Sequence, residues 1–231
     1  MKSNTEVKTK MMYVSFCDIL GFSNAIENNF EDTVKIYLEL KEEVLNIVKI
    51  DGVSVSIYSD AIIVVGKDFA NVVEAVKQIY WFCLLHDLLI RGGLAYGKHW
   101  SNVENGSILI LSEALVEAVK IEKSIKHPII AVSEKINIPI EAWMPHCEGA
   151  VFNAPFINYD EINFVNPFNA FWFRSAEMRL KHLLKKIPNH SHKYEWLLNI
   201  IEKIKIDDVL IPDDVFNYLL EKGVLTYIDK G

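Results

Sequence analysis

The sequence predicts an α+β fold, with a ferredoxin-like core followed by a mostly helical C-terminal segment. Short apolar runs rich in β-branched residues alternate with two long stretches of helical periodicity over roughly the first 100 residues. Their order is strand, helix, strand, strand, helix, strand, which is that of a split βαβ core. Glycine, serine and aspartate stand where the apolar runs must turn. These observations together favour a ferredoxin-like core with an appended helical layer.

The first half of the core opens with a buried strand, Tyr13 to Asp18, and Gly21 marks the turn directly after it. Apolar residues then recur at helical spacing from about 30 to 50, with charged residues between them, which predicts an amphipathic helix. Residues 53–65 first alternate and then become continuously apolar. This pattern predicts two strands joined by a tight turn at Tyr58-Ser59-Asp60.

The second half begins with a helix over residues 69–89, which is apolar almost all round and so largely buried. Residues 90–98 form a glycine-rich strand, whose glycines indicate a bulge or a close approach of backbone. A third helix over 112–125 has Ser112 as its N-cap. A strand at 129–132 follows it.

After about residue 148 the composition shifts toward Asn, Phe and Pro. We therefore divide the chain into a core domain, residues 1–150, and an accessory, mostly helical segment, residues 151–231. The accessory segment has one predicted strand and three predicted helices, at 162–165, 175–187, 192–205 and 213–221.

Composition narrows the possible partners. The net charge of −7 argues against a protein that coats nucleic acid or binds a membrane through a basic patch. The most apolar stretch, Ile79 to Ile90, is interrupted by His86 and Asp87 and is too short to span a bilayer. The first residues lack the apolar core of a signal peptide. We expect neither a nucleic-acid nor a membrane partner.

The cysteines indicate a reducing compartment. Cys17, Cys83 and Cys147 are scattered, odd in number and set among large apolar residues. That pattern is typical of reduced core cysteines and not of a disulfide framework or a zinc site. We therefore predict a cytoplasmic protein.

Two carboxylates carry the functional information. Asp18 ends the first strand and Asp60 stands at the tip of the predicted hairpin, and in a ferredoxin-like sheet these two positions are neighbours. Two such carboxylates without Lys or Arg nearby in sequence would repel unless a cation joined them. Two divalent ions about 3.5–4 Å apart are the usual arrangement for phosphoryl chemistry. The backbone N–H groups of residues 19–23 could then face the phosphates of a bound triphosphate. The alternative is that each Asp is only a cap or turn residue.

Four stretches resemble class III nucleotidyl cyclase domains. Residues 16–23 (FCDILGFS) resemble the signature F-x-D-I-x-G-F-[ST] that opens these domains, and residues 58–61 (YSDA) stand where they carry an I-G-D-A turn. Residues 91–97 (RGGLAYG) are similar to their later strand R-x-G-[IL]-x-x-G, and residues 114–133 to their closing helix and strand. The resemblance covers approximately residues 11–135.

The resemblance implies a two-metal cyclase that acts on a nucleoside triphosphate. Asp18 and Asp60 would share two Mn²⁺ or Mg²⁺ ions, with the backbone carbonyl of Ile19 as a further ligand. Gly21, Phe22 and Ser23 would lie against the triphosphate. One metal would lower the pKa of the ribose 3′-hydroxyl that attacks the α-phosphorus, and the other would stabilise the departing pyrophosphate. Such domains work as dimers, so a homodimer with sites at the interface is implied.

The sequence departs from the family at the base-selecting positions. Adenylyl and guanylyl cyclases carry a Lys or Glu shortly before the turn, where this chain has Ser56 or Ile57. The turn glycine is replaced by Ser59, and a bulky Tyr58 precedes it. These differences make a standard purine site less expected.

A second departure lies on the closing helix. The family's transition-state Asn and Arg, spaced four apart, align with Val116 and Lys120. Lys120 can replace the charge of that arginine but not its two-pronged hydrogen bonding.

These departures resemble the pyrimidine cyclases of bacterial Pycsar antiphage systems. In that interpretation Tyr58 lies against a uracil or cytosine ring, with Ser56 in the same pocket, and Arg91 helps to orient the base. The product would be cyclic UMP or cyclic CMP, acting on a separate effector protein in antiphage defence. As alternatives, Tyr58 covers the core, Arg91 pairs with a surface carboxylate, and Lys120 is simply solvated.

Three other functions stay open at this point. The chain could be a purine cyclase with a different base pocket, or a non-catalytic module that kept the metals and lost turnover. It could also join two nucleotides, as diguanylate cyclases do, although it lacks a G-G-D-E-F-like hairpin.

Overall fold

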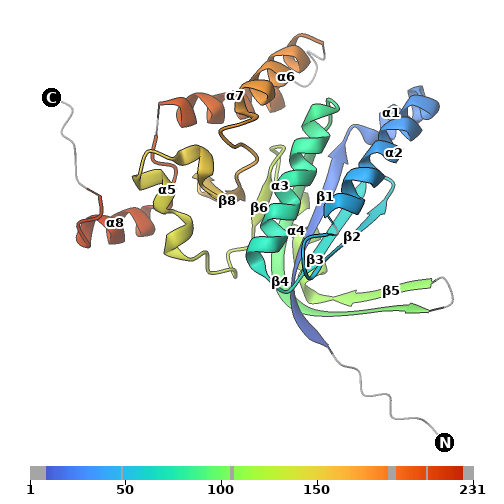
Figure 1. Cartoon of the computed structure of the whole chain (residues 1–231), viewed down its shortest axis with the longest axis horizontal. Coiled ribbons are helices and arrows are strands. Elements are labelled where there is room, and N and C mark those ends of the chain that lie inside the picture. The colour runs from blue at the N-terminus through green and yellow to red at the C-terminus, as the bar shows by residue number, and fades with distance from the viewer. Residues whose placement is uncertain (1–8, 48, 105–106, 187–190, 207, 226–231) are drawn as a thin grey trace, which may run out of the picture.

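The computed structural model describes residues 9–47, 49–104, 107–186, 191–206 and 208–225 (Figure 1). Within them, one sheet has the strand order β2-β3-β1-β4-β6-β8-β7, and β5 pairs with β4 outside that path. The strands are β1 (Lys10–Leu20), β2 (Val53–Tyr58), β3 (Ala61–Gly66), β4 (Leu89–Glu104), β5 (Ser107–Ser112), β6 (Ile130–Val132), β7 (Phe156–Tyr159) and β8 (Ile162–Val165).

The helices separate these strands in the predicted order through β4. They are α1 (Phe22–Asn28), α2 (Phe30–Ile47), α3 (Phe69–Leu85), α4 (Glu113–Ser124), α5 (Met144–Cys147), α6 (Phe173–Lys186), α7 (Ser191–Lys205) and α8 (Asp213–Glu221), with short 3₁₀ turns at Ile140–Ala142 and Val151–Asn153. The pairings among the first four strands are all antiparallel, and β4 also pairs in parallel with β6. The ferredoxin-like core is therefore confirmed.

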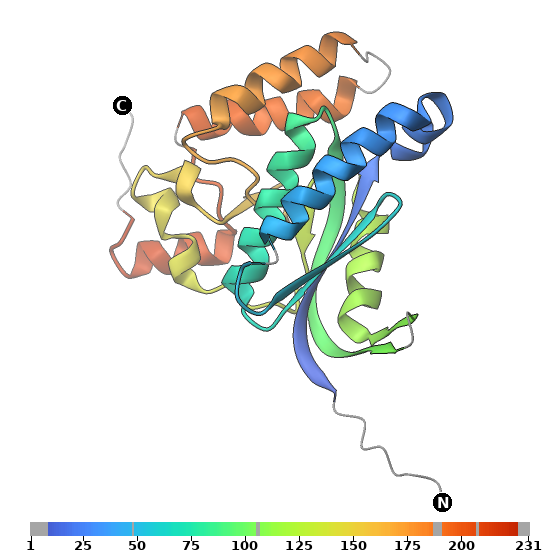
Figure 2. The ribbon, with the colours of Figure 1, turned by 45° about the vertical axis from the view of Figure 1, so that its right-hand side comes forward.

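Helices cover both faces of this core. Helices α2 and α3 lie on one face and α4 on the other, as the two views in Figures 1 and 2 show. The main core lies under α2 and α3, where Val72, Val76 and Ile79 of α3 are fully buried. On the other face, a Cβ added to Gly93 would lie 2.4 Å from the carbonyl oxygen of Ala118. Glycine in β4 therefore lets α4 pack directly onto the strand.

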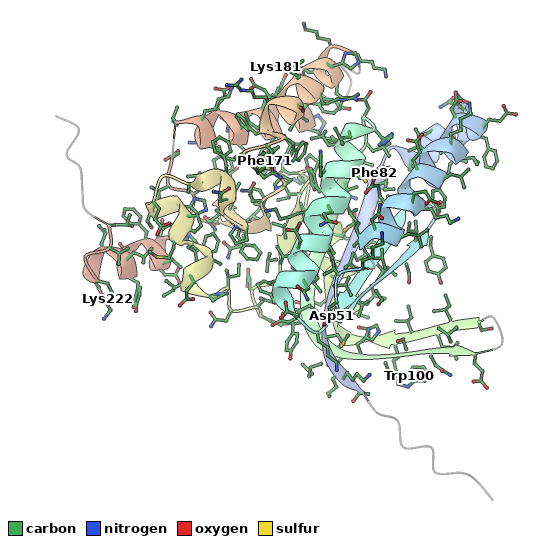
Figure 3. All side chains as sticks on the ribbon, viewed as in Figure 1. Asp51, Phe82, Trp100, Phe171, Lys181 and Lys222 are labelled. Atoms are coloured by element: carbon green, nitrogen blue, oxygen red, sulfur yellow. The ribbon has the colours of Figure 1, made fainter. Side chains whose placement is uncertain are left out.

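Strand β4 runs further than the sequence pattern predicted. It continues to Glu104 and pairs with β5, so the two strands form an arm that projects from the body; Trp100 lies on it (Figure 3). The arm carries exposed apolar side chains, among them Val103 at 73% and Leu111 at 74% exposure. The dipeptide Asn-Gly at 105–106 is a hairpin signature that could have revealed β5.

The C-terminal segment continues the sheet. Strand β8 pairs with β6 through Ala131 and Phe164, and β7 pairs with β8. The division at residue 150 stays a prediction, but the sheet itself crosses it. The predicted helices at 175–187, 192–205 and 213–221 correspond to α6, α7 and α8.

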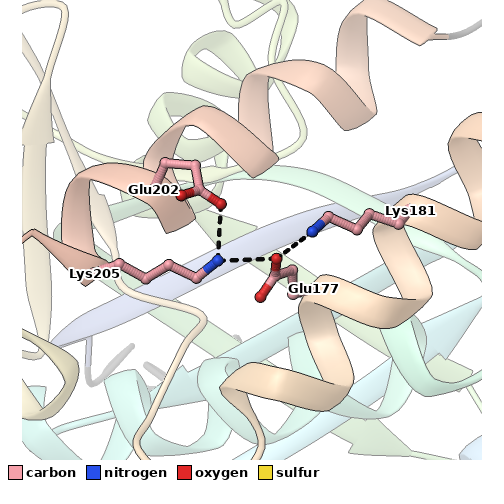
Figure 4. A network of polar contacts seen from close by, with 4 residues as sticks. All are labelled: Glu177, Lys181, Glu202 and Lys205. Atoms are coloured by element: carbon pink, nitrogen blue, oxygen red, sulfur yellow. Dashed lines mark hydrogen bonds and ion pairs between the residues drawn. The ribbon is translucent and has the colours of Figure 1, made fainter.

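Helices α6 and α7 form a hairpin with its own buried core. Leu180 and Leu183 of α6 and Leu197 and Ile200 of α7 are fully buried there, together with Leu84 of α3. A polar network also ties the pair: Lys205 contacts Glu202 at 2.8 Å and Glu177 at 2.9 Å, and Glu177 also pairs with Lys181 (Figure 4). The hairpin is thus joined to the core as well as held internally.

Two further expectations concern the whole chain. All three cysteines are free, and Cys17 and Cys83 are buried, as predicted. In the described ranges, no helix is long and apolar enough to cross a membrane.

Candidate active site

The structure brings Asp18 and Asp60 to the same edge of the sheet. Asp18 lies near the end of β1, where its pairing partner is Ala61, the first residue of β3. Asp60 immediately precedes Ala61, and the N–H of Ile19 donates a hydrogen bond to the carbonyl of Asp60 at 2.8 Å. The hydroxyl of Ser23 also donates to the Asp60 carboxylate, at 3.5 Å. The predicted neighbourhood of the two aspartates is therefore present.

The electrostatics of this edge favour a bound cation. Burial first, and then the negative charges of Asp60 and Glu122, raise the pKa of Asp18 above its ordinary value. Arg91 and Lys193 act in the opposite direction but do not reverse the shift. Two carboxylates that repel each other in a partly buried place are stabilised by a divalent ion with a preference for oxygen ligands.

The backbone adds a third oxygen. In an antiparallel ladder the N–H and the C=O of one residue face the same neighbouring strand. Because the N–H of Ile19 bonds to Asp60, the carbonyl of Ile19 faces Asp60 as well. The described residues contain no cluster of three or more His, Cys, Asp or Glu that could hold a metal. The donor set of two carboxylates and a carbonyl therefore suits ions that also bind oxygens of a substrate.

Arg91 is held by a glutamate that the sequence did not single out. Its Nε donates to Oε1 of Glu122 at 2.8 Å, its terminal nitrogen contacts the same oxygen, and that nitrogen lies 3.7 Å from Oδ2 of Asp18. Glu122 is on α4 and its side chain is only 7% exposed. Arg91 therefore links Asp18 to α4. The carboxylate partner of Arg91 is thus buried and not a surface residue, and a role of Arg91 in orienting a base stays a prediction.

The residues predicted to meet the base share one face of the sheet with Asp18. Pairing aligns Tyr58, Ala61, Asp18 and Arg91 in one row across β2, β3, β1 and β4. Directly paired residues point to the same face. Ser56, two residues before Tyr58, points to that face too, and Tyr58 is 51% exposed. Both side chains can therefore face a ligand bound beside the aspartates.

The turn that carries Asp60 has an unusual backbone. Ser59 adopts a φ of 53°, in the left-handed region that the family's glycine would adopt without strain. The backbone of Ser59 hydrogen bonds to the Tyr37 hydroxyl, and burial raises the pKa of that tyrosine. A contact from α2 thus helps to fix the turn despite the missing glycine.

The residues after β1 combine a tight turn with a buried aromatic side chain. Gly21 has a φ of 79° and turns the chain into α1, as predicted. Phe22, however, is only 3% exposed and packs near Tyr37, with ring centroids 6.0 Å apart. The Phe22 side chain is thus largely part of the core, and the placement of Phe22 and its neighbours against a triphosphate stays a prediction. Ser23 is exposed beside Asp60.

Lys120 lies apart from the aspartates within one chain. It is exposed on α4 and lines a groove of about 690 Å³ with residues of β4 and β5, including Trp100 and Leu111. Val116 lines the same groove. The groove lies where β4 and β5 of the arm meet α4. One chain therefore does not place Lys120 in the site formed by Asp18 and Asp60.

No protein-family model and no curated protein match this chain by sequence. Solved structures do match. A bacterial light-regulated adenylyl cyclase aligns over 78% of this chain and 59% of its own, with a TM-score of 0.50 and 14% identity. Adenylyl cyclase CyaB of P. aeruginosa aligns over 55% and 79%, with a TM-score of 0.45 and 18% identity. The dimeric guanylyl cyclase domain of the RhoGC fusion protein of Blastocladiella emersonii aligns over 55% and 82%, with a TM-score of 0.45 and 20% identity.

At these identities the comparisons establish the fold. The chain has the α+β fold of class III nucleotidyl cyclase domains, which is the fold predicted from residues 11–135.

Proposed function

We propose that the protein is a nucleotidyl cyclase, which converts a nucleoside triphosphate into its 3′,5′-cyclic monophosphate and pyrophosphate. The observation that carries the proposal is the placement of Asp18 and Asp60 at adjoining positions of β1 and the β2–β3 turn, in a fold shared with known cyclases. The partly buried pair repels itself and would be neutralised by divalent ions.

The chain's residues have separate roles in this proposal. Asp18, Asp60 and the carbonyl of Ile19 would hold two Mn²⁺ or Mg²⁺ ions, which supply Lewis-acid activation of the attacking and leaving oxygens. Arg91, fixed by Glu122, places a permanent positive charge beside Asp18. Gly21 and Ser23 form the turn that faces the phosphates.

For the base, we propose a pyrimidine, UTP or CTP. Support comes from Ser56 and Tyr58, which point to the face of Asp18. A short hydroxyl and an exposed aromatic ring stand where purine cyclases have a charged base-selecting residue. A purine substrate is the competing proposal, because the similar structures are named adenylyl and guanylyl cyclases. The cyclic product would act on a separate effector in antiphage defence, which rests on the resemblance to Pycsar cyclases alone.

We also propose that the active form is a homodimer. The exposed apolar residues of the β4–β5 arm, with Val116 on the adjacent helix, form a surface suited to a second copy. A partner could bring Lys120 toward the site from the other chain, which one chain alone does not achieve.

The test is turnover of each of the four triphosphates by purified protein with Mn²⁺, with products identified by mass. A cyclic pyrimidine nucleotide that disappears in Asp60→Ala supports the proposal. A cyclic purine as the main product supports the competing one. Triphosphate binding without any cyclic product would indicate a non-catalytic binding module.

A further inference from the structure

We propose that the accessory α6–α7 hairpin contributes Lys193 to the substrate site, where its ammonium group binds the triphosphate. This inference rests on the proposed function, since it assigns a substrate contact at the site of Asp18 and Asp60. It gives the C-terminal segment a direct part in substrate binding in addition to its part in the fold.

The start of α7 belongs to the same hydrophobic core that the end of β1 near Asp18 packs against. Tyr194 is 5% exposed in the core formed by α6 and α7, and Leu89, the first residue of β4, belongs to the same core. Leu20, the last residue of β1, packs against this core as well. Lys193 directly precedes Tyr194, and Asp18 stands two residues before Leu20. The first turn of α7 therefore borders the site.

Contacts with neighbouring segments fix the hairpin in this place. Asp87, just before β4, accepts a hydrogen bond from Arg179 of α6 at 3.0 Å and pairs with Lys186 at 3.6 Å. On the side of α4, His127 stacks on Trp196 of α7, with ring centroids 4.4 Å apart. The views in Figures 1 and 2 both show the hairpin beside the C-terminal end of α3, near the end of the sheet where β1 stops.

The charges at the site call for a further cation. Asp18 and Glu122 pair with the guanidinium of Arg91, and the charge of Asp60 also acts on Asp18, so negative charge is in excess. A triphosphate adds about four negative charges at neutral pH, which is as much as two divalent ions supply. Metal ions alone would therefore leave the filled site negative, and a nearby ammonium would stabilise it.

Lys193 is suited to supply this additional positive charge. It takes part in none of the hydrogen bonds and ion pairs found among the described residues, and its side chain is only partly exposed. Among the charged groups that act on Asp18, Lys193 is the one that the hairpin contributes. Other lysines of the hairpin, such as Lys181 and Lys205, are already paired with glutamates.

The experiment measures binding separately from turnover. Full-length protein is titrated by calorimetry with Mn²⁺ and 3′-deoxy-UTP or 3′-deoxy-ATP, which keep the triphosphate but lack the attacking hydroxyl, and with UMP or AMP. The variants are Lys193→Ala, Lys193→Arg and, as a matched control, Lys67→Ala. Lys67 is exposed and follows β3 at the end opposite Asp60. Melting temperatures verify that each variant is folded.

We expect Lys193→Ala to weaken triphosphate binding by roughly 3- to 10-fold, as for loss of one partly screened charge contact. Lys193→Arg should retain most of the affinity, monophosphate binding should change less than triphosphate binding, and Lys67→Ala should match the wild type. Equal affinities in Lys193→Ala and Lys67→Ala, or an equal loss for monophosphates, would overturn the inference. Wild-type protein that binds the analogues but cyclises no triphosphate refutes the proposed function alone. Wild-type protein that binds none of them refutes both.

Discussion

Replacing Glu122 by Gln tests whether α4 holds the arginine beside the site. The carboxylate of Glu122 accepts two contacts from Arg91, one of them at 2.8 Å, and its side chain is 7% exposed. The substitution keeps the shape and one oxygen acceptor but removes the negative charge. The guanidinium of Arg91 is then left beside a neutral, weaker hydrogen-bond partner.

The expected cost follows from that burial. Hydrogen bonds to charged groups contribute about 1.5–3 kcal/mol, and removing one partner of a buried ion pair costs about 3–5 kcal/mol. Because Gln keeps an acceptor and Arg91 is partly exposed, we expect a loss of about 2 kcal/mol in the free energy of unfolding. In a chain of this size that lowers the melting temperature by about 4–8 °C.

Glu117→Gln is the matched control for urea and thermal unfolding. Glu117 lies on the same helix and pairs with Lys135 at 3.0 Å, but that lysine is 71% exposed. Such a surface pair contributes about 0–1 kcal/mol. If the two variants lose equal stability, then Glu122 does not hold Arg91 as described, and the reasoning from burial fails.

Three further predictions follow from other parts of the structure. Because the folded state raises the pKa of Asp18, the folded protein binds that proton more tightly than the unfolded chain, and ionisation lowers stability as the pH rises. Asp18→Asn should therefore have a higher melting temperature than the wild type at pH 7 in EDTA. This difference in melting temperature should vanish below the ordinary Asp pKa of about 3.9. A difference that stays constant across that pH range would contradict the argument. Ser59→Val should cost about 1–2 kcal/mol in urea unfolding, because a β-branched residue is strained at a φ of 53°, whereas Ser59→Gly should not be destabilised. Val103→Glu combined with Leu111→Glu should convert a dimer into a monomer in sedimentation experiments, whereas Phe171→Glu, at a 99% exposed position shown in Figure 3, should not.

The sequence was sufficient to predict the core and its acidic pair. Apolar runs that end at Asp18 and around Asp60 determine where the strands stop, and the order of elements makes those ends neighbours. The ferredoxin-like order leaves few other topologies, so local patterns carried most of this information. The same patterns placed α6, α7 and α8 at their observed positions.

The rest depended on contacts between distant parts of the chain. Glu122 looks like any polar residue of an amphipathic helix, and only the packing of α4 against Gly93 brings it to Arg91. Phe22 has the same residue type as in the signature, but its burial depends on Tyr37 of α2. Lys193 gained its position through the packing of α7 near Leu20. None of these pairings leaves a periodic signal in the sequence.

The pairing of β6 with β8 also has a consequence for biosynthesis. Until residue 165 has left the ribosome, β6 is an edge strand with unpaired backbone groups. Leu84 and Leu89 likewise lack the apolar side chains of α6 and α7 against which they pack in the finished protein. A nascent chain that has completed residues 1–150 thus still exposes part of its future interior. We expect it to depend on chaperones at that stage, and truncation near residue 150 to yield aggregated protein.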